Sequence, residues 1–286
     1  MTSLAILLVL TSAFTHALWN FIAKRAHGGP AFVWLFGVFE LFIYLPFLLL
    51  FIASEDPTLA AVDLVAILGS GCLHLVYFLL LTRGYQVGDL SLVYPLARAV
   101  GPLIATFAAI LFFAERPTPL AFGGGLLICG GVFWLTGDPR KLRENDALQG
   151  VIYALLTGLA IAGYTLWDSY SVSRLLIAPM VYQWGLGLVR STLLTPYNLR
   201  HRENLRLAWR DDKWKALAVG TLGFFSYLLI LVAYEFSPVS YVAPMRVIST
   251  LIGVLMGSRF LGEGDTRRRL AAAGAMVLGV IALGVG

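Results

Sequence analysis

The stretch of sequence that decides the fold covers residues 82–115 and reads TRGYQVGDLSLVYPLARAVGPLIATFAAILFFAE. Its tyrosine, proline, arginine and glutamate return in residues 234–263, which read YEFSPVSYVAPMRVISTLIGVLMGSRFLGE. The arginine returns from Arg98 to Arg246, an offset of 148 residues, while the tyrosine and the proline return at an offset of 149. A single-residue slip between the proline and the arginine reconciles the two offsets. The pattern indicates that the second half of the chain repeats the first.

A second pair of motifs extends the repeat to the beginning of each half. Residues 18–20 read LWN and residues 166–168 read LWD, again at an offset of 148. Each copy contains five long apolar segments, so the chain is predicted to cross a membrane ten times. An odd number of spans forces the second copy to insert upside down. Inverted repeats of this kind are an architecture of membrane transporters.

The composition also places the chain in a bilayer. Hydrophobic residues make up 59% of the 286 residues and charged residues 13%, whereas a soluble domain carries about 25% charged residues. The predicted fold class is an all-α polytopic membrane protein with two inverted five-helix repeats. A span needs about 20 mostly apolar residues, and the segments that qualify are 3–22, 32–53, 62–82, 90–113, 118–136, 148–170, 178–196, 214–235, 238–259 and 267–285.

Lysine and arginine are distributed unevenly over the predicted loops. Of the 21 in the chain, sixteen follow odd-numbered spans, two follow even-numbered spans and three fall within spans. Loops rich in positive charge stay in the cytoplasm, so both termini are expected in the periplasm. Spans 1 and 6 then run in opposite directions, as an inverted repeat requires. The basic pI of about 9.3 follows from these loops, and nucleic acid is not an expected partner.

The domain organisation follows the repeat. The first repeat is expected at residues 1–137, a cytoplasmic linker at 138–147 and the second repeat at 148–286. Besides this linker, only the connection near 197–213 contains a long polar segment, and it is predicted to be a loop.

Two polar and aromatic stripes occupy equivalent positions in spans 1 and 6. Their members stand at positions i, i+3 and i+4, which share one helix face: His16, Trp19 and Asn20 in span 1, and Tyr164, Trp167 and Asp168 in span 6. One interpretation is that the stripes form two related walls of a cavity. The alternative is an aromatic belt at the membrane boundary, with polar groups at the helix ends.

Arginines stand at membrane depth in spans 4 and 9. Arg98 follows Tyr94 at i+4, and both Arg98 and Arg246 lie about eight residues, or roughly 12 Å, into their spans. The two spans start from opposite sides, so the two arginines fall on opposite sides of the midplane. A guanidinium suits a carboxylate or a phosphate, which favours a role in a cavity or gate. The alternative is a side chain that extends along its helix to the interface.

Other titratable residues lie inside the spans of one half only. His74 and Tyr77 share a face of span 3, and Glu40 lies near the middle of span 2. Ionisable residues at membrane depth are costly and often functional. Glu40, His74 and Asp168 are therefore candidate proton carriers. Each could instead tie two helices together.

Spans 4 and 9 also contain residues that interrupt or bend helices, and they are the expected moving elements. The candidate hinge positions are Pro95, Gly101, Pro102, Pro244 and Gly253. Spans 5 and 10 are rich in glycine, which allows helices to approach closely, so they are expected to be a packing scaffold. Glu115 and Glu263 follow spans 4 and 9 and are expected to form loop salt bridges or to cap the next helix.

No cofactor or metal site is predicted. Cys72 and Cys129 lie within apolar runs and offer neither a disulfide framework nor zinc spacing. The glycines of span 5 are not followed by Gly-Lys-Ser/Thr, which excludes a nucleotide-binding loop there.

The two halves resemble a known family. Residues 82–137 and 233–284 resemble the second part of an EamA domain, and HALWN at 16–20 and YTLWD at 164–168 fit its opening. The chain is identified as a two-EamA-domain member of the drug/metabolite transporter superfamily. This resemblance implies that helices 1–4 and 6–9 surround a central cavity, with helices 5 and 10 as support. It also implies similarity to ten-span exporters of amino acids, including aromatic ones, although sugar-phosphate translocators share the fold.

The resulting expectation is a secondary exporter of amino acids, including aromatic ones, or of related small metabolites across the bacterial inner membrane. It would work by alternating access without ATP, as a monomer or weak homodimer in contact with membrane lipid. The alternatives are an exporter of cationic drugs, which would depend on Glu40 or Asp168, and a polytopic membrane enzyme. The candidate substrate-binding residues are His16, Trp19, His74, Tyr77, Tyr94, Arg98, Tyr164, Trp167 and Arg246.

Overall fold

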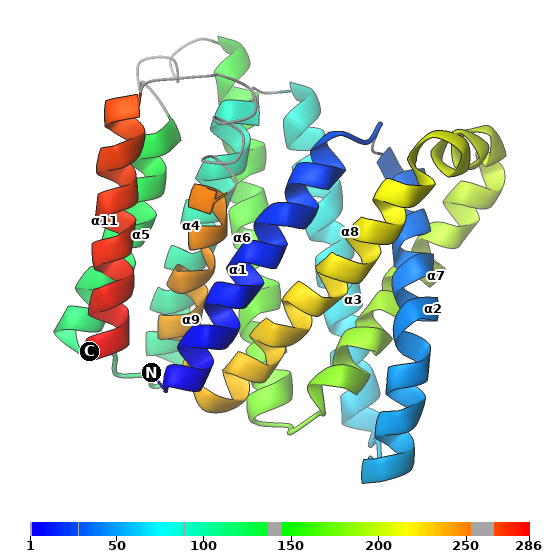
Figure 1. The fold of residues 1–286 in the computed structure, drawn as a ribbon, viewed down its shortest axis with the longest axis horizontal. Coiled ribbons are helices and arrows are strands. Elements are labelled where there is room, and N and C mark those ends of the chain that lie inside the picture. Colours follow the sequence, from blue (N-terminus) through cyan, green and yellow to red (C-terminus); the bar gives the residue numbers. More distant parts are fainter. Residues whose placement is uncertain (1, 28, 88–89, 137–144, 253–265) are drawn as a thin grey trace.

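The computed structural model describes residues 2–27, 29–87, 90–136, 145–252 and 266–286. The described residues form ten α-helices and no strand (Figure 1). The helices are α1 Ser3–Lys24, α2 Gly29–Glu55, α3 Ala61–Val87, α4 Leu90–Phe112, α5 Pro119–Thr136, α6 Asn145–Ser173, α7 Pro179–Arg200, α8 Arg202–Phe236, α9 Val239–Arg246 and α11 Thr266–Val285.

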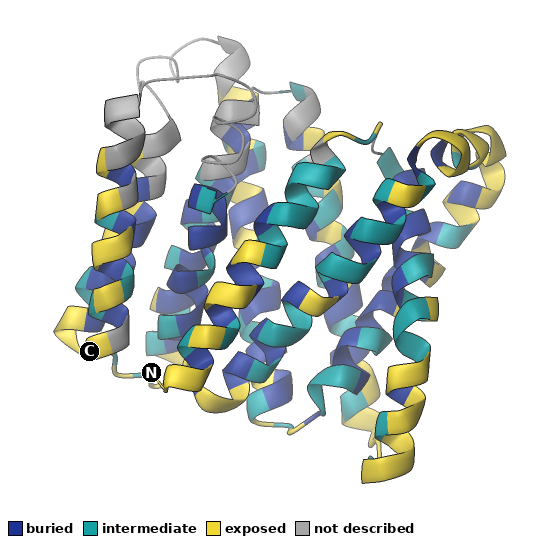
Figure 2. Cartoon of the chain, viewed as in Figure 1, coloured by how far each residue is buried: buried dark blue, intermediate teal, exposed yellow. Residues whose placement is uncertain are grey.

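The helices form because a bilayer leaves backbone groups no partner except one another. Five of them, α1, α2, α3, α6 and α8, are long and apolar enough to cross a membrane, and α4, α5, α9 and α11 contribute shorter apolar segments. Large apolar side chains are exposed along the outer faces of these helices, whereas buried residues gather between them (Figure 2). Such an apolar exterior is typical of a surface that faces lipid.

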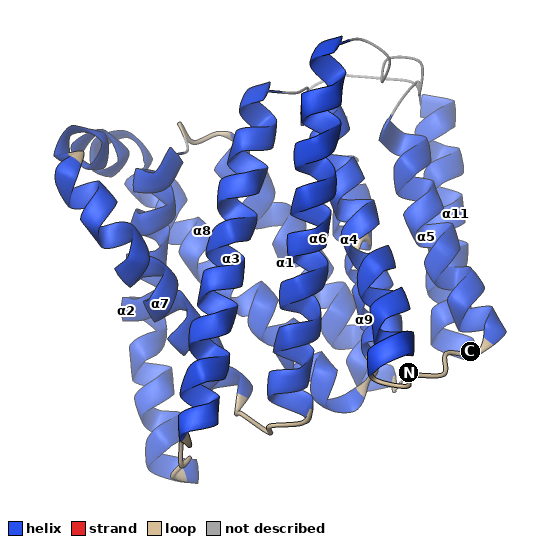
Figure 3. Ribbon diagram, turned by 180° about the vertical axis from the view of Figure 1, so that it is seen from behind, coloured by secondary structure: helices blue, strands red, loops and turns tan. Residues whose placement is uncertain are grey.

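The two halves are related by inversion. Both chain ends lie at the same end of the molecule; α1 runs away from that end and α6 runs towards it (Figure 1). The packing is also paired, because α1 packs on α8 as α6 packs on α3. Helices α2, α4 and α5 contact their own counterparts α7, α9 and α11. Figure 3 shows α5 and α11 as a pair at one edge of the molecule.

Glycines lie where counterpart helices cross most closely. A Cβ at Gly37 of α2 would stand 2.6 Å from Oγ of Ser191 in α7, and a Cβ at Gly187 of α7 would stand 2.5 Å from Oε1 of Glu40 in α2. The two contacts are reciprocal, so the axis that relates the repeats passes between α2 and α7. The α5–α11 crossing is likewise reciprocal, because a Cβ at Gly124 or at Gly279 would lie 2.6 Å from the carbonyl oxygen of the other glycine.

The prediction of a polar loop at 197–213 is wrong. Helix α7 continues to Arg200 and α8 begins at Arg202, so only His201 lies between them. The segment 202–213 contains neither glycine nor proline and has leucine, alanine and arginine, which favour helix. Its polar residues therefore mark a helix outside the apolar region and do not mark a loop.

Helix α9 is shorter than the span predicted at 238–259. It ends at Arg246, a turn follows at Val247, and helix resumes from 248 to 252. The Val247 amide donates to the Pro244 carbonyl at 3.0 Å, and the Thr250 amide donates to the Val247 carbonyl at 2.9 Å. These bonds join residues three apart, a tighter turn than that of an α-helix. The interruption therefore falls beside Arg246, near the middle of the fold.

The other predicted hinge positions have different surroundings. The backbone of α4 is helical through positions 95, 101 and 102, although the side chain at position 95 lies outside the described part of the chain. A Cβ at Gly101 would stand 2.6 Å from Cγ2 of Ile161, so this glycine lets α4 pack closely on α6. Gly253 lies outside the described residues.

Glu115 holds a helix terminus, but not that of the next helix. Its two carboxylate oxygens accept the amide hydrogens of Val239 and Ser240, each at 2.9 Å. It therefore caps α9, whose first amides have no partner within the helix, and does not cap α5. Glu263, the equivalent residue in the repeat, lies outside the described residues.

Candidate functional site

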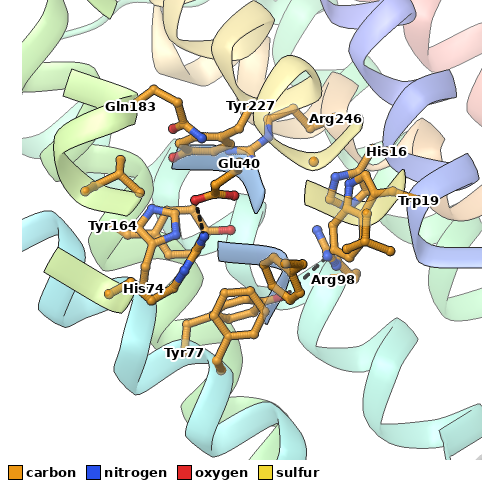
Figure 4. Close-up of a pocket in the computed structure, with 16 residues that line it drawn as sticks. His16, Trp19, Glu40, His74, Tyr77, Arg98, Tyr164, Gln183, Tyr227 and Arg246 are labelled. Carbon is orange, nitrogen blue, oxygen red and sulfur yellow. Dashed lines mark hydrogen bonds and ion pairs between the residues drawn. The ribbon is translucent and has the colours of Figure 1, made fainter. Parts of the chain in front are cut away.

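A small cavity of about 70 Å³ lies between the two repeats (Figure 4). Its walls come from α1–α4 and α6–α9, whereas the described residues of α5 and α11 contribute none of them. Seven of the nine predicted substrate-binding residues line it: His16, Trp19, His74, Tyr77, Arg98, Tyr164 and Arg246.

The remaining two predicted residues are not among the lining residues. The side chain of Tyr94 lies outside the described part of the structure. Trp167 was predicted to bind substrate, but it is not a lining residue. It is 41% exposed, and its indole Nε1 donates to the Ala66 carbonyl at 2.8 Å. The indole packs where Gly69 leaves room, since a Cβ there would stand 2.7 Å from the ring. Trp167 thus fills the α3–α6 contact and does not reach the cavity.

Two arginines from symmetry-related helices share the cavity. Arg98 of α4 donates through Nη2 to the Tyr77 hydroxyl at 3.3 Å, and Arg246 of α9 donates through Nη1 to the Tyr234 hydroxyl at 3.3 Å. Arg246 also lies 5.3 Å from the centroid of the Tyr227 ring, a cation–π contact. Both arginines line a second, smaller cavity of about 20 Å³ as well. A ligand in this region therefore meets two guanidinium groups.

A third arginine forms a buried ion pair on the repeat axis. Arg190 of α7 donates through Nη2 to Oε1 of Glu40 in α2, and both side chains line the cavity. The guanidinium carbon of Arg190 also lies 5.3 and 5.6 Å from the ring centroids of Phe36 and Phe78. Charges withdrawn from water need such partners to offset the loss of hydration. Glu40, predicted as a proton carrier, is therefore the partner of an arginine.

Asp168 is fully buried immediately behind the cavity wall. Its Oδ1 accepts from the hydroxyls of Ser70 at 2.6 Å and Tyr182 at 2.8 Å. Its Oδ2 accepts from the Tyr227 hydroxyl and contacts Nε2 of His74 at 3.0 Å. Hydrogen bonds to a charged group are among the strongest in proteins, so this cluster holds α3, α6, α7 and α8 together. Of the two candidate proton carriers in it, only His74 faces the cavity.

Aromatic rings form much of the remaining wall. The His74 ring stacks on Tyr164 at a centroid distance of 4.2 Å, and Tyr77 meets Tyr164 edge to face at 5.6 Å. His16 meets Trp19 edge to face at 4.9 Å. Of the predicted stripe of span 1, His16 and Trp19 line the cavity and Asn20 does not. Nδ2 of Asn20 instead donates to the His16 carbonyl at 2.7 Å. The Asn20 side chain thus bonds within its own helix.

Several buried polar atoms of the cavity wall have no hydrogen-bond partner among the described residues. They are Nε2 of His16, Nε1 of Trp19, Oε1 of Gln183 and Nε of Arg190. Buried polar groups are nearly always hydrogen-bonded, so these atoms are available to a ligand. The described residues form no group of three or more His, Cys, Asp or Glu side chains that would suit a metal ion.

Sequence reasoning missed Gln183, Arg190 and Tyr227 as cavity residues. A signal existed for Arg190, because it follows Glu40 by 150 residues, close to the repeat offset of 148. The sequence analysis found Glu40 in one half only, because the offset drifts by two in this region. Tyr227 also had a signal, because it follows Tyr77 by 150 residues. No amide or charged residue stands at the repeat offset from Gln183, so only its polarity within an apolar span could have indicated it.

An inverted pair of helical repeats around a polar cavity is the architecture of secondary transporters. The chain belongs to the EamA-like transporter family, whose model matches residues 3–137 and 148–285. A protein of known crystal structure has a similar fold, with a TM-score of 0.74 and 13% sequence identity over 100% of this chain and 98% of that one. The protein is thus a multi-pass membrane transporter of the EamA type.

Proposed function

We propose that the protein exports amino acids, aromatic ones among them, or closely related small carboxylates across the bacterial inner membrane. The observation that carries this proposal is the pair Arg98 and Arg246, which face one cavity from the symmetry-related helices α4 and α9. A planar guanidinium binds a carboxylate through parallel hydrogen bonds. Trp19 adds a donor, because its Nε1 is buried in the same wall without a partner among the described residues.

The balance of charge also favours an anionic group. Arg98, Arg190 and Arg246 supply three positive charges, whereas Glu40 and Asp168 supply two negative charges, so the site has an excess of one positive charge when its histidines are neutral. This excess attracts the carboxylate of a substrate, and a simple monocarboxylate neutralises it, whereas a zwitterionic amino acid has no net charge and leaves it unchanged. Charges act strongly here because the surroundings have a low dielectric constant.

Export of cationic drugs is the second candidate. The surroundings of the two carboxylates, Glu40 and Asp168, do not favour it. Glu40 already pairs with Arg190, and Asp168 is surrounded by Ser70, Tyr182, Tyr227 and His74. A cation would have to displace one of these partners. The enzyme alternative is not favoured by any of these contacts, and the family to which the chain belongs is one of transporters.

The rings of Trp19, Tyr77, Tyr164 and Tyr227 supply the apolar part of the binding site. Access would alternate as α3–α4 and α8–α9 rock against the remaining helices. The interruption at Val247 beside Arg246 suits α9 to such a motion, since short broken helices are frequent at transporter binding sites. Transport would be passive or coupled to protons, with His74 as the cavity-facing carrier.

The test uses purified protein in proteoliposomes and a panel of labelled amino acids and cationic dyes. Arg98→Ala and Arg246→Ala should each reduce amino-acid uptake by about tenfold or more, since a hydrogen bond to a charged group contributes about 1.5–3 kcal/mol. Arg210→Ala is the matched control, because Arg210 pairs with Asp211 on the protein surface. Transport of a dye but of no amino acid would refute the proposal, and an imposed pH gradient would distinguish passive from coupled movement.

A further inference from the structure

Gln183 is a cavity residue without a hydrogen-bond partner for its carbonyl oxygen. Its side chain comes from α7 and lines the cavity (Figure 4). Only 3% of the residue is exposed, and Oε1 has no partner among the described residues. A buried amide carbonyl without a partner is costly unless something else satisfies it.

The two sequence neighbours of Gln183 are both fixed. The Tyr182 hydroxyl donates to Asp168 of α6 at 2.8 Å, and Nε1 of Trp184 donates to the Leu41 carbonyl of α2 at 3.1 Å. One turn further on, a Cβ at Gly187 would stand 2.5 Å from Oε1 of Glu40, so α7 cannot turn or move away without loss of close packing. The backbone of Gln183 is therefore held between α6 and α2, with its amide directed at the cavity.

The position of Gln183 separates it from Arg98. In Figure 4, Gln183 lies on the side of the cavity with His74 and Tyr164, and Arg98, His16 and Trp19 lie on the opposite side, whereas Arg246 lies between the two sides next to Tyr227. A substrate whose carboxylate binds at Arg98 would thus direct another of its groups towards Gln183. The α-ammonium is bonded to the same carbon as the carboxylate and stays near Arg98, so the group that crosses the cavity to Gln183 belongs to the side chain. The free carbonyl can only accept a hydrogen bond, so a side-chain donor satisfies it.

We propose that Gln183 binds an N–H or O–H donor of the substrate and so selects amino acids with a hydroxyl or carboxamide side chain over apolar ones of the same shape. This inference rests on the proposed function and narrows its substrate class. A site built to hydrogen-bond a polar group discriminates strongly against an analogue that lacks it, because the protein atom is then left buried and unpaired. A small cavity of about 70 Å³ also suits a small substrate.

The test compares amino acids of matched shape with and without a donor. L-threonine is compared with L-valine, and L-asparagine with L-leucine, as ligands of the purified full-length protein by calorimetry and as competitors of uptake into proteoliposomes. The wild-type protein should prefer the polar member of each pair by about tenfold or more, the effect of roughly one lost hydrogen bond.

Gln183→Met retains the length of the side chain and removes the carbonyl, so it should reduce this preference to within about threefold while L-valine and L-leucine bind as before. Gln183→Glu retains an acceptor and should retain the preference, which keeps the proposal testable if the methionine variant fails to fold. Leu188→Met is the control on the same helix, because Leu188 is 43% exposed and does not line the cavity, and it should leave the preference unchanged.

The failures of the two proposals are distinguishable. If the wild-type protein binds both members of each pair equally, and binding still requires Arg98, the carboxylate site stands and the role of Gln183 is refuted. Retention of the full preference in Gln183→Met refutes it as well. If none of the four amino acids binds, the proposed function fails, and this inference fails with it.

Discussion

The buried pair Glu40 and Arg190 shows how a single residue departs from the repeat. The two residues stand 150 positions apart on counterpart helices and carry opposite charges. A strictly symmetric pair would place two like charges next to each other on the axis, which is unfavourable. Opposite charges allow the two repeats to be tied together where they meet. The difference in charge at these two positions therefore stabilises the contact between the two repeats.

This pair gives a prediction at the residue scale. Glu40→Gln removes one charge and leaves the Arg190 guanidinium buried between Phe36 and Phe78. Breaking a buried pair in this way costs about 3–5 kcal/mol, so the variant should unfold at a clearly lower temperature in detergent. The double variant Glu40→Leu/Arg190→Met should recover most of the loss, because apolar side chains replace buried pairs well. Equal stability of the single variant and the wild-type protein would contradict the account.

Some of the site residues could be predicted from the sequence. Arg98 and Arg246 repeat at the offset of the whole block, and His16 and Trp19 share a helix face, so both pairs were predicted to face a cavity. Trp167 occupies the position equivalent to Trp19 but packs against Gly69. That outcome depends on which small residue the neighbouring helix presents. Periodicity in one helix carries no information about its neighbour, which is also why Gln183 was not identified.

At the scale of elements, carboxylates at both ends of the molecule fasten helix termini and loops. Glu115 caps α9 near the end where the chain termini lie. At the other end, Oδ2 of Asp212 in α8 accepts from the His27 amide at 2.9 Å, and its Oδ1 accepts from Nζ of Lys215 at 2.6 Å. Asp212 thus ties the α1–α2 connection to the beginning of α8.

Neighbouring aspartates give a matched pair of variants for this element. Asp212 is 1% exposed, whereas Asp211 pairs with Arg210 on the surface. Asp212→Ala leaves the His27 amide and the Lys215 ammonium without their acceptor and should lower the free energy of unfolding by about 1–3 kcal/mol. Asp211→Ala should change it by less than about 1 kcal/mol, because surface pairs contribute little. Thermal unfolding in detergent measures both, and a larger loss in Asp211→Ala would contradict the role of Asp212.

The elements also show where reading spans from hydropathy succeeds and where it fails. Apolar runs located the helices because the bilayer forces such runs to form helix. The polar segment 202–213 was misread as a loop, since hydropathy reports contact with lipid and not backbone conformation. The interruption at Val247 was anticipated only through Pro244, and its position beside Arg246 required the hydrogen bonds of the folded chain.

At the scale of the whole molecule, inversion explains why one cavity contains two arginines. Each repeat supplies one arginine from its fourth helix, and the axis between α2 and α7 brings both to the centre. Two equivalent half-sites suit a transporter that exposes its substrate to either side in turn. Helices α5 and α11 remain at the edge, where Gly124 and Gly279 allow close packing. The duplication and the inversion of the second repeat were predicted from the repeat offset and the odd number of spans in each half.

The central claim is that this cavity binds the carboxylate of its substrate through Arg98 and Arg246. The most direct test compares an L-amino acid with the amine obtained by removing its carboxylate, such as L-tyrosine and tyramine, in uptake by proteoliposomes that contain the purified protein. The account predicts saturable uptake of at least one amino acid of the panel, no uptake of its amine, and loss of uptake in both Arg98→Ala and Arg246→Ala. Transport of the amine as fast as the amino acid, unaffected by either substitution, would contradict it.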